Sequence, residues 1–494
     1  MGDLRNEGGT PIVNFGGNVS FTPRHRYAPR SEAEVLEVLD RHAGGAIRVV
    51  ASLHSWSDDV VCDDVILDLC HFDRVAVETR DGETWATVGA GCVLADALAR
   101  IHAAADATLP SFGAVTVQRM AGVVSTATHG SGRSSFSHYM SALRVAAYDP
   151  ETGKAKIFEF AGGEELLAAR CAIGALGVIL ELRFRCVPTY CIAETLVRRA
   201  TLDEVLADEA TFPLQQFVLV PYLWAFVVFQ RRDAGSERPS WWRVIHRLYA
   251  FVGIDVLLHV LIKLLVTIGR GGWIRWFFRS MFIRLAWLNR TVIDHSERIL
   301  TLHHELFKHL EMEMFVPGSR LAEAVALARY VTATFDGCDV KPDPAVEAAL
   351  AGIGMLDELR SRAGSYTHHY PIFFRRVLPD DALISMTAGA SEPFYAISFF
   401  SYREPRTSFY VFADFLSRAL NRLYRARPHW GKYFPLDYAD IDELYPRLAE
   451  FRAICCRYDA RGTFRNRYVA RVLGFARADG THASQASTWP SPAK

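Results

Sequence analysis

The sequence lacks an excess of charge of either sign. Its 494 residues include 55 Lys and Arg against 55 Asp and Glu, so the formal net charge is zero. Such a chain presents no overall positive field to a polyanion, and we expect no nucleic-acid partner. The first residues, "MGDLRNEGGT", form no apolar leader and carry no Ser or Thr at the sixth position for myristoylation. The sequence therefore predicts a cytoplasmic location, with peripheral membrane contact as an open alternative.

Cysteine pairs and the common nucleotide-binding motifs are missing as well. The nine cysteines are an odd number without a C-x-x-C pair, which predicts reduced thiols and no metal site. No G-x-G-x-x-G follows the first predicted strand, and no G-x-x-x-x-G-K-[ST] occurs. A Rossmann or P-loop site is therefore not indicated.

Apolar residues are abundant, at half of the chain, and their order indicates an α+β fold. Residues 1–188 alternate strand-like and helical stretches, with a helix capped by Ser31 and a hairpin around Asp81. Residues 189–425 contain further strands and a long helix, which predicts a second domain with its own sheet. Residues 426–476 end in two helices, and the polar, Pro- and Ser-rich residues 477–494 are predicted to be a disordered tail.

An insertion over residues 240–290 differs from the rest of the second domain. It holds five of the ten tryptophans, and it has eight basic residues against the single acid Asp255. "YAFVGIDVLLHVLIKLLVTIG" is long enough to cross a bilayer, but Asp255, His259 and Lys263 recur every four residues on one helical face. This spacing favours a helix at a membrane surface over a spanning one. The alternative is a helical hairpin packed on the second domain or in an oligomer interface.

Three stretches of sequence are candidates for chemistry. In "RVVASLHSWSDD" a lone His54 follows a strand, a position more typical of a structural histidine. Residues 109–132, "LPSFGAVTVQRMAGVVSTATHGSG", form a small-residue loop that lets backbone N–H groups approach a phosphate or a flat ring, although it also suits a tight packing crossover. In "RPHWGKYF", His429 and Lys432 flank an aromatic residue, either as an anion stabiliser or as a helix end with a solvated lysine.

Taken together, these stretches resemble a known family. "AGVVSTATHGSG", "IGALGVI" and "HWGK", in this order along nearly the whole chain, are similar to the covalent flavoprotein oxidases of the vanillyl-alcohol-oxidase superfamily, in the aldonolactone and alditol oxidase branch. The resemblance implies a PCMH-type FAD-binding domain of two subdomains, made of residues 1–188 and the returning segment 426–476. It also implies a cap domain with an antiparallel substrate-binding sheet over residues 189–425. The insertion is not part of the family pattern.

The cofactor that the resemblance implies is FAD, bonded covalently to His54. Ala51 and Leu53 replace the glycines that are common beside this histidine. Gly113 stands where related lactone dehydrogenases have a bulkier alanine, which implies reoxidation by O2 with release of hydrogen peroxide. The further FAD contacts implied are Ser52, Leu53, Ser55, Ser57, Ser111, Gly113, Gly122, Thr126, Ala127, Thr128, His129, Val178 and His429.

The reaction that the resemblance implies is hydride transfer to flavin from the CH–OH group of a sugar lactone or sugar alcohol, with Arg375, Lys432 and Ser401 as catalytic residues. The family's Glu-x-Arg corresponds to "FFR" at the start of "FFRRVLPDD", so Phe373 replaces a carboxylate, and Phe399 replaces a histidine on the next strand. A register shifted by two residues would also explain both phenylalanines.

The more apolar pocket gives the alternative substrate, an apolar or lipid-linked alcohol oxidised at a membrane with a quinone or cytochrome as acceptor. A flavin-free membrane-surface scaffold is the rival from another class. The presence of His54, Arg375 and Lys432 speaks against it.

Overall fold

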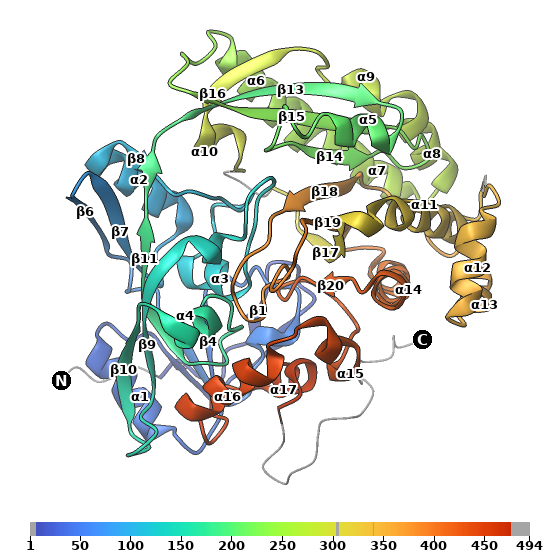
Figure 1. The fold of residues 1–494 in the computed structure, drawn as a ribbon. Coiled ribbons are helices and arrows are strands. Elements are labelled where there is room, and N and C mark those ends of the chain that lie inside the picture. The colour runs from blue at the N-terminus through green and yellow to red at the C-terminus, as the bar shows by residue number, and fades with distance from the viewer. Residues whose placement is uncertain (1–5, 303–305, 339, 476–494) are drawn as a thin grey trace.

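The structure is a computed structural model that describes residues 6–302, 306–338 and 340–475. The predicted disordered tail, 477–494, lies outside the described residues. Figure 1 shows the N-terminal half and the C-terminal helices in one part of the molecule, with a large sheet and its helices beside them. The prediction of an α+β fold is confirmed.

The N-terminal part contains two sheets. The smaller one has the parallel order β3-β5-β4, and α1 (Glu32–Arg41) follows its first strand. Ser31 caps this helix as predicted, because its hydroxyl accepts the N–H of Glu34 at 3.3 Å. The strands of this smaller sheet are β3 (His25–Tyr27), β4 (Ile47–Val50) and β5 (Val65–Asp68), with the short helix η1 (Asp58–Val60) before the last, and β1 (Ile12–Val13) pairs separately with β2 (Ser20–Phe21).

The second sheet is antiparallel, with the order β10-β9-β11-β7-β6. Asp81 and Gly82 have φ of 52° and 79°, as the tight turn of the predicted hairpin requires. Its strands are β6 (Val75–Arg80), β7 (Glu83–Gly89), β9 (Met140–Tyr148), β10 (Ala155–Phe160) and β11 (Val178–Arg185), and β8 (Ala107–Thr108) pairs separately with β12 (Val187–Pro188). The helices here are α2 (Leu94–Ala105), α3 (Met120–Ser125), η2 (Phe136–Tyr139) and α4 (Gly163–Ala169).

One correction concerns the small-residue loop over residues 109–132. Its middle forms the helix α3, because Met120, Val123 and Val124 find buried positions on one face of it. The segments before and after α3 are not helical, so the backbone of this stretch still lies close to the neighbouring parts of the chain.

The cap sheet has eight strands in the order β16-β13-β15-β14-β18-β19-β17-β20. Alternate residues face opposite sides: Phe217 and Leu219 join the core with α11 (Leu321–Asp336) and α14 (Arg406–Tyr424), whereas Gln216 and Val218 face a cavity. The strands are β13 (Cys191–Arg199), β14 (Gln216–Leu219), β15 (Phe226–Gly235), β16 (Thr291–His295), β17 (His309–Pro317), β18 (Ile372–Val377), β19 (Phe394–Tyr402) and β20 (Arg427–Pro428). Smaller helices are α5 (Leu202–Ala207), α10 (Ser296–Ile299), η4 (Gly318–Arg320), α12 (Pro344–Gly352) and α13 (Leu356–Ser361).

The C-terminal segment packs back on the N-terminal part. Arg48 on β4 donates hydrogen bonds to the carbonyls of Phe464 and Ile173, each at 2.8 Å, which ties three distant segments together. The elements of this segment are α15 (Tyr438–Ile441), η5 (Asp442–Leu444), α16 (Leu448–Tyr458) and α17 (Arg467–Leu473).

The insertion is a set of helices on the cavity side of the cap sheet. Its first part is one continuous helix made of α6 (Arg243–Tyr249), the π-helical η3 (Ala250–Leu258) and α7 (His259–Ile268); α8 (Gly271–Ser280) and α9 (Phe282–Leu285) follow. Over residues 243–268 this helix is long and apolar enough to cross a membrane by length and composition, and 11% of its most apolar stretch is buried in the protein. Leu258, Ile262 and Leu265 pack against Val218 and Val227 of the cap sheet.

Candidate active site

A cavity of about 620 Å³ lies between the N-terminal part, the cap sheet and the insertion. Its walls include the turn around His54, the helix α3, the loop after Pro428 and the cavity face of the cap sheet. Residues that are far apart in the chain thus meet around one space, and such a concave space with few convergent polar groups is where ligands bind.

The turn from Ser52 to Ser57 forms one wall. Leu53 has a left-handed φ of 55°, which turns the chain sharply before His54. The His54 ring stacks on Phe15, with centroids 4.7 Å apart, and its Nδ1 lies 3.0 Å from the carbonyl oxygen of Ser52. A carbonyl only accepts hydrogen bonds, so Nδ1 carries the ring hydrogen and Nε2 carries the lone pair.

Small residues bring the backbone close to the cavity on the opposite side. A Cβ added at Gly122 would lie 3.4 Å from the Cβ of Ala51, so even an alanine at position 122 would fill the space between these two residues. Ala127 and Gly174 have left-handed φ values of 51° and 68°. Asp59 also lines the cavity, and among the described residues its Oδ1 has no hydrogen-bond partner, while burial raises its pKa to about 6.

The C-terminal loop is bound to the turn at His54. The backbone N–H of Trp56 donates to the carbonyl of Gly431 at 2.7 Å. The hydroxyl of Ser55 donates to the same carbonyl at 3.2 Å, and the hydroxyl of Ser57 donates to the carbonyl of Trp430 at 2.9 Å. The ammonium group of Lys432 lies 4.2 Å from the centre of the Trp56 ring, a cation–π contact. These bonds hold His429 and Lys432 against the cavity.

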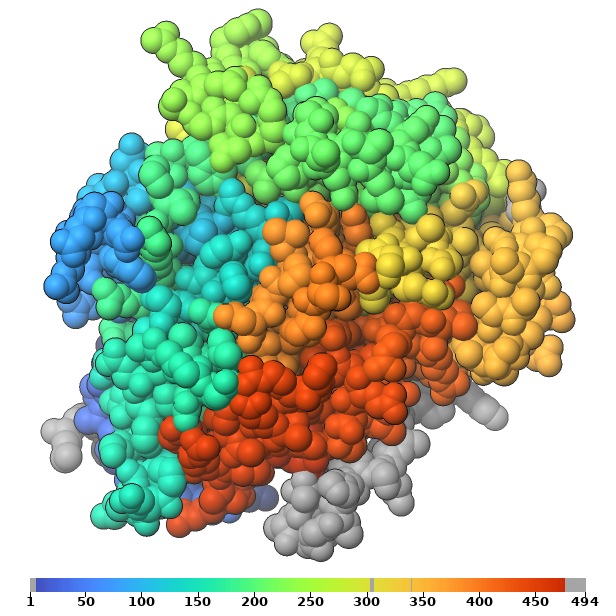
Figure 2. All heavy atoms as spheres, in the orientation of Figure 1, coloured from blue at the N-terminus to red at the C-terminus, as the bar shows by residue number. Residues whose placement is uncertain are grey.

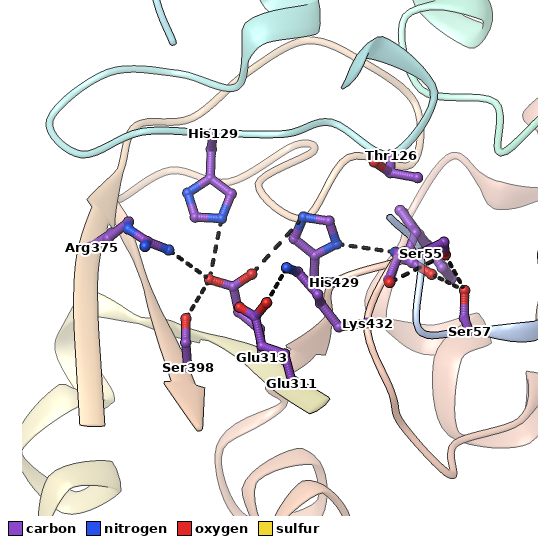
Figure 3. Close-up of polar contacts among 12 residues, drawn as sticks. Ser55, Ser57, Thr126, His129, Glu311, Glu313, Arg375, Ser398, His429 and Lys432 are labelled. Atoms are coloured by element: carbon purple, nitrogen blue, oxygen red, sulfur yellow. Dashed lines mark hydrogen bonds and ion pairs between the residues drawn. The ribbon is translucent and has the colours of Figure 1, made fainter. Parts of the chain in front are cut away.

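The centre of the site is Glu313, which is 1% exposed (Figure 3). The hydroxyl of Ser398 donates to its Oε1 at 2.7 Å, and Nε2 of His129 and Nη1 of Arg375 lie 3.4 and 3.5 Å from the same oxygen. Burial by itself raises the pKa of Glu313, but His129, His429 and Lys432 together outweigh burial and bring the pKa well below its usual range. Glu313 is therefore an ionised carboxylate that collects donors around it.

Two histidines, His129 and His429, lie beside Glu313, and the contacts of His429 show which of its ring nitrogens carries the hydrogen. Nδ1 of His429 accepts the N–H of Gly431 at 3.1 Å, so Nε2 carries the hydrogen and points toward Glu313 at 3.9 Å. Burial lowers the pKa of His429 to about 3, so this imidazole is neutral. His129, Glu313 and His429 have ligand atoms within 4.8 Å of one another, as at metal sites. A hydrogen on Nε2 of His429 leaves no lone pair there for a metal.

A second buried pair lies two residues earlier on β17. Nζ of Lys432 donates to Oε2 of Glu311 in a close ion pair, and Glu311 is 3% exposed (Figure 3). Burial raises the pKa of Glu311 to about 7, against the opposing effect of the Lys432 charge. This carboxyl group is thus able to take up or release a proton near neutral pH.

Beyond these polar groups the cavity becomes apolar. Phe373 and Phe400 meet edge to face with centroids 5.4 Å apart, and Tyr370 lies 6.0 Å from Phe400. His259 bonds to the hydroxyls of Tyr370 and Tyr402, and burial lowers its pKa to about 4. The other apolar residues of this part come from the cap sheet and the insertion: Leu196, Val218, Val227, Phe229, Ile254, Leu258, Ile262, Phe282, Leu285 and Phe307.

The predicted catalytic residues divide between two faces. Phe373 and Arg375 both face the cavity, as the proposed alignment of "FFR" requires. Ser401 is a correction: its hydroxyl lies 3.3 Å from His369 on the other face of β19, and Phe399 packs on Phe412 there. Because faces alternate along a strand, the residues of β19 that face the site are Ser398 and Phe400.

The predicted cofactor residues also differ in position. Those on the cavity wall are Ser52, Leu53, His54, Ser55, Gly122, Thr126, Thr128, His129 and His429. Ser111 donates to the carbonyl of Ser134 at 3.4 Å, Val178 is fully buried between the wall residues Gly177 and Ile179, and Ala127 is also buried. Gly113 lies behind Thr128, since an added Cβ would meet Cγ2 of Thr128 at 2.4 Å.

Glu311 and Glu313 are the site residues that the sequence analysis missed. Their signal is the alternation in "HLEMEMFVP", where two acids share one face of an otherwise buried strand. Buried acids without partners are costly, so this pattern indicates paired cations elsewhere in the chain.

Comparison with known proteins agrees with this arrangement. Residues 23–158 match the family model of the FAD binding domain, and residues 182–472 match that of D-arabinono-1,4-lactone oxidase. A long-chain alcohol oxidase from an uncultured marine euryarchaeote is 41% identical over 96% of this chain and 98% of its own length. The L-gulonolactone oxidase of Bos taurus is 26% identical over 94% of this chain and 98% of its own. The crystal structure of cholesterol oxidase from Brevibacterium sterolicum has the same fold, with a TM-score of 0.74 at 13% identity over 96% of this chain and 98% of that chain.

The cavity fits FAD. The small residues Ala51 and Gly122 line the cavity and leave room for a flat ring, and Oδ1 of Asp59, without a hydrogen-bond partner among the described residues, offers an acceptor to a hydroxyl of the cofactor. The predicted resemblance and the FAD cofactor are confirmed by the two family models. The chain belongs to the D-arabinono-1,4-lactone oxidase family, as a FAD-dependent oxidase that acts on CH–OH donors.

Proposed function

We propose that this enzyme oxidises an alcohol carried on a long apolar chain. The observation that supports this proposal most strongly is the apolar part of the cavity, which leads from Phe373 and Phe400 under the insertion helices. The 41% identical relative is named for long-chain alcohols. Phe373 in place of the family carboxylate removes a group that would bind a polyol, and burial of apolar chain is favourable in its place.

The polar end of the cavity binds the hydroxyl group in this proposal. Nζ of Lys432 and the guanidinium of Arg375 hold the substrate oxygen, and Glu313 orients Arg375. The hydroxyl proton of the substrate passes to Glu311 through the ion pair with Lys432. Lys432 then donates a hydrogen bond to the substrate oxygen and stabilises it. Neutral His429 donates toward Glu313 and keeps this charge in place. Phe400 and Trp56 exclude water from the reacting carbon.

FAD, when bound, accepts the hydride of the carbinol carbon, so the products are a carbonyl compound and the reduced cofactor. We place it along Ala51–Trp56, α3 and Gly174, with His54 joined to its 8-methyl group. Nε2 of His54 carries the lone pair that this bond needs. Forming the bond removes one hydrogen from the methyl carbon and one from the imidazole, and O2 takes up the pair as hydrogen peroxide.

O2 is the electron acceptor in this proposal. Gly113 leaves Thr128 in place on the wall, because a side chain at position 113 would push Thr128 into the cavity. The glycine thus keeps room beside the cofactor. A long apolar alcohol partitions into lipid, and a cytoplasmic enzyme that is peripheral on a membrane suits such a substrate.

A sugar lactone is the second candidate substrate. The match of residues 182–472 to the D-arabinono-1,4-lactone oxidase model favours it, as do the cations Arg375 and Lys432, which bind oxygens of any hydroxylated substrate.

The test is a panel of alkanols and sugar lactones mixed with purified holoenzyme without oxygen. We expect apolar alcohols to bleach the flavin absorbance, and air to restore it with hydrogen peroxide. Bleaching by lactones and not by alkanols would show that the substrate is a sugar lactone, the second candidate.

A further inference from the structure

We infer that the outer face of the insertion docks on an anionic lipid bilayer, with the cavity beneath it. This inference rests on the proposed substrate, because it names the surface from which an apolar alcohol reaches the site. The insertion forms one end of the molecule, far from α15, α16 and α17 (Figures 1 and 2).

The exposed side of the long helix is apolar. Leu248, Leu257 and Leu264 are 61%, 60% and 55% exposed, and Trp241 just before the helix is 83% exposed. The opposite side, with Leu258, Ile262 and Leu265, is already packed on the cap sheet. A surface helix of a soluble protein normally turns polar residues outward, so apolar residues on the outer face as well indicate an apolar partner.

The second helix of the insertion extends the same surface. On α8, Trp273 and Trp276 are 53% and 55% exposed, whereas Ile274 and Phe277 of the same helix are buried. Tryptophans with one wet and one apolar edge are enriched where a protein meets the headgroup region of a bilayer.

The charge of the insertion distinguishes a bilayer from other partners. Residues 240–290 carry eight basic residues and one acid in a chain whose net charge is zero. Arg243 and Arg247 are near Asp294, and Arg275 pairs with Asp336. Lys263, Arg270, Arg279, Arg284 and Arg290 are exposed. Cations beside an apolar face fit anionic headgroups.

A second copy of the chain fits this surface less well. A two-fold contact sets the same patch against itself, so the basic residues of both copies would face one another. A helix that crosses the bilayer is also disfavoured, because the inner face would have to leave Val218 and Val227 of the cap sheet. The helix therefore lies along the bilayer surface, as amphipathic interfacial helices do.

The cavity lies directly behind this surface. Tyr249, Ile254 and Leu258 of the long helix line the cavity, while Leu248 and Leu257, their neighbours in sequence, are exposed. One helix thus has the membrane-facing residues on one side and the substrate wall on the other. An alcohol dissolved in the lipid has a short apolar route to Phe400.

The test is flotation of the full-length holoenzyme with phosphatidylcholine vesicles, with and without added phosphatidylglycerol. We expect binding that increases with the anionic lipid. Leu248→Ser with Leu264→Ser should weaken binding to both kinds of vesicle at least about tenfold. Arg270→Gln with Arg284→Gln should weaken binding about fivefold per residue, and only to the anionic vesicles. The control, Val13→Ser, removes a 52% exposed apolar residue on β1 of the N-terminal part and should leave binding unchanged.

Activity separates this inference from the proposed function. The leucine variant should keep its rate on a water-soluble alkanol and lose its rate on a long-chain alcohol embedded in vesicles. Oxidation of alkanols by a wild-type enzyme that binds no vesicle would overturn the docking surface and leave the proposed function standing. Vesicle binding without oxidation of any alkanol would overturn the proposed function and leave the docking surface standing. A dimer in solution that the leucine variant dissociates, together with no vesicle binding, would assign the surface to a second copy.

Discussion

At the level of single residues, we expect the ion pair between Glu311 and Lys432 to set the pH dependence of the reaction. The pKa of Glu311 is raised to about 7, and the proposal needs its ionised form to take up the hydroxyl proton. Protonation below that pKa removes the base, so flavin reduction should slow as the pH falls through about 7. Stopped-flow reduction without oxygen measures this limb.

The variant Glu311→Gln tests that assignment. Loss of a positioned general base costs on the order of 100-fold in rate, and the pH limb should vanish with it. The control is Glu323→Gln, an exposed acid on α11 that pairs with Arg320. A limb that persists in Glu311→Gln would show that another group accepts the proton.

In the proposed function His54 carries the covalent attachment to FAD, and loss of this bond should be visible in the mass of the chain. Under denaturing conditions the wild-type polypeptide should carry the extra mass of FAD, and His54→Ala should not. The exposed His71→Ala serves as the control and should retain the adduct. An adduct that survives in His54→Ala places the bond on another residue, and a wild-type chain without adduct means that FAD is bound without a covalent bond.

Individual site residues were predictable from the sequence where a motif surrounds them. His54, Arg375, His429 and Lys432 lie within recognisable stretches, and the structure brings all four to one cavity. Glu311 and Glu313 lie in "HLEMEMFVP", but their role could not be predicted from it, because it depends on partners from four other segments of the chain. The family alignment placed Ser401 on the site, but Ser401 lies on the other face of β19, and Ser398 is the serine of this strand that bonds to Glu313.

At the level of elements, the insertion is held on the cap by buried aspartates. Asp336, at the end of α11, accepts hydrogen bonds from Arg275 of α8 at 2.9 Å and from the hydroxyl of Thr367 at 2.7 Å. Its side chain is fully buried, so both donors depend on it. This pair anchors the second helix of the insertion.

Asp336→Ala should therefore loosen the insertion. Because Arg275 keeps partial access to water, we expect a loss of about 2 kcal/mol in the free energy of unfolding, below the range for a fully buried pair. Chemical denaturation measures the loss, and the exposed Asp73→Ala should stay within about 0.5 kcal/mol of wild type. Equal stability of the two variants would mean that apolar packing alone holds α8.

Elements with strong local signals were predictable. The Ser31 cap and the Asp81-Gly82 turn have the predicted form, since short-range chemistry decides both. The helix α3 was not predicted within residues 109–132, because its small residues favour neither helix nor loop until Met120 and Val124 find a core to pack on.

At the level of the whole molecule, the FAD-binding domain and the cap sheet are common to the family. The insertion adds a further wall to the cavity between them. The insertion could be identified as unusual from the sequence, but the face that packs on the protein could not be predicted, since both faces are rich in apolar residues. Only the packing of Ile262 and Leu265 on the cap shows which face is inside. In the proposed function this wall decides how long a substrate the cavity accepts.

The dependence of kcat/KM on the chain length of linear alkanols tests the proposed substrate most directly. Each methylene buried in the apolar part of the cavity contributes about 0.8 kcal/mol, or roughly fourfold in kcat/KM. We therefore predict that kcat/KM rises steadily with chain length until the cavity of about 620 Å³ is filled, and stays well above the value for sugar lactones. A profile that is flat with chain length, or a higher kcat/KM for lactones, would contradict the assignment of this enzyme to long apolar alcohols.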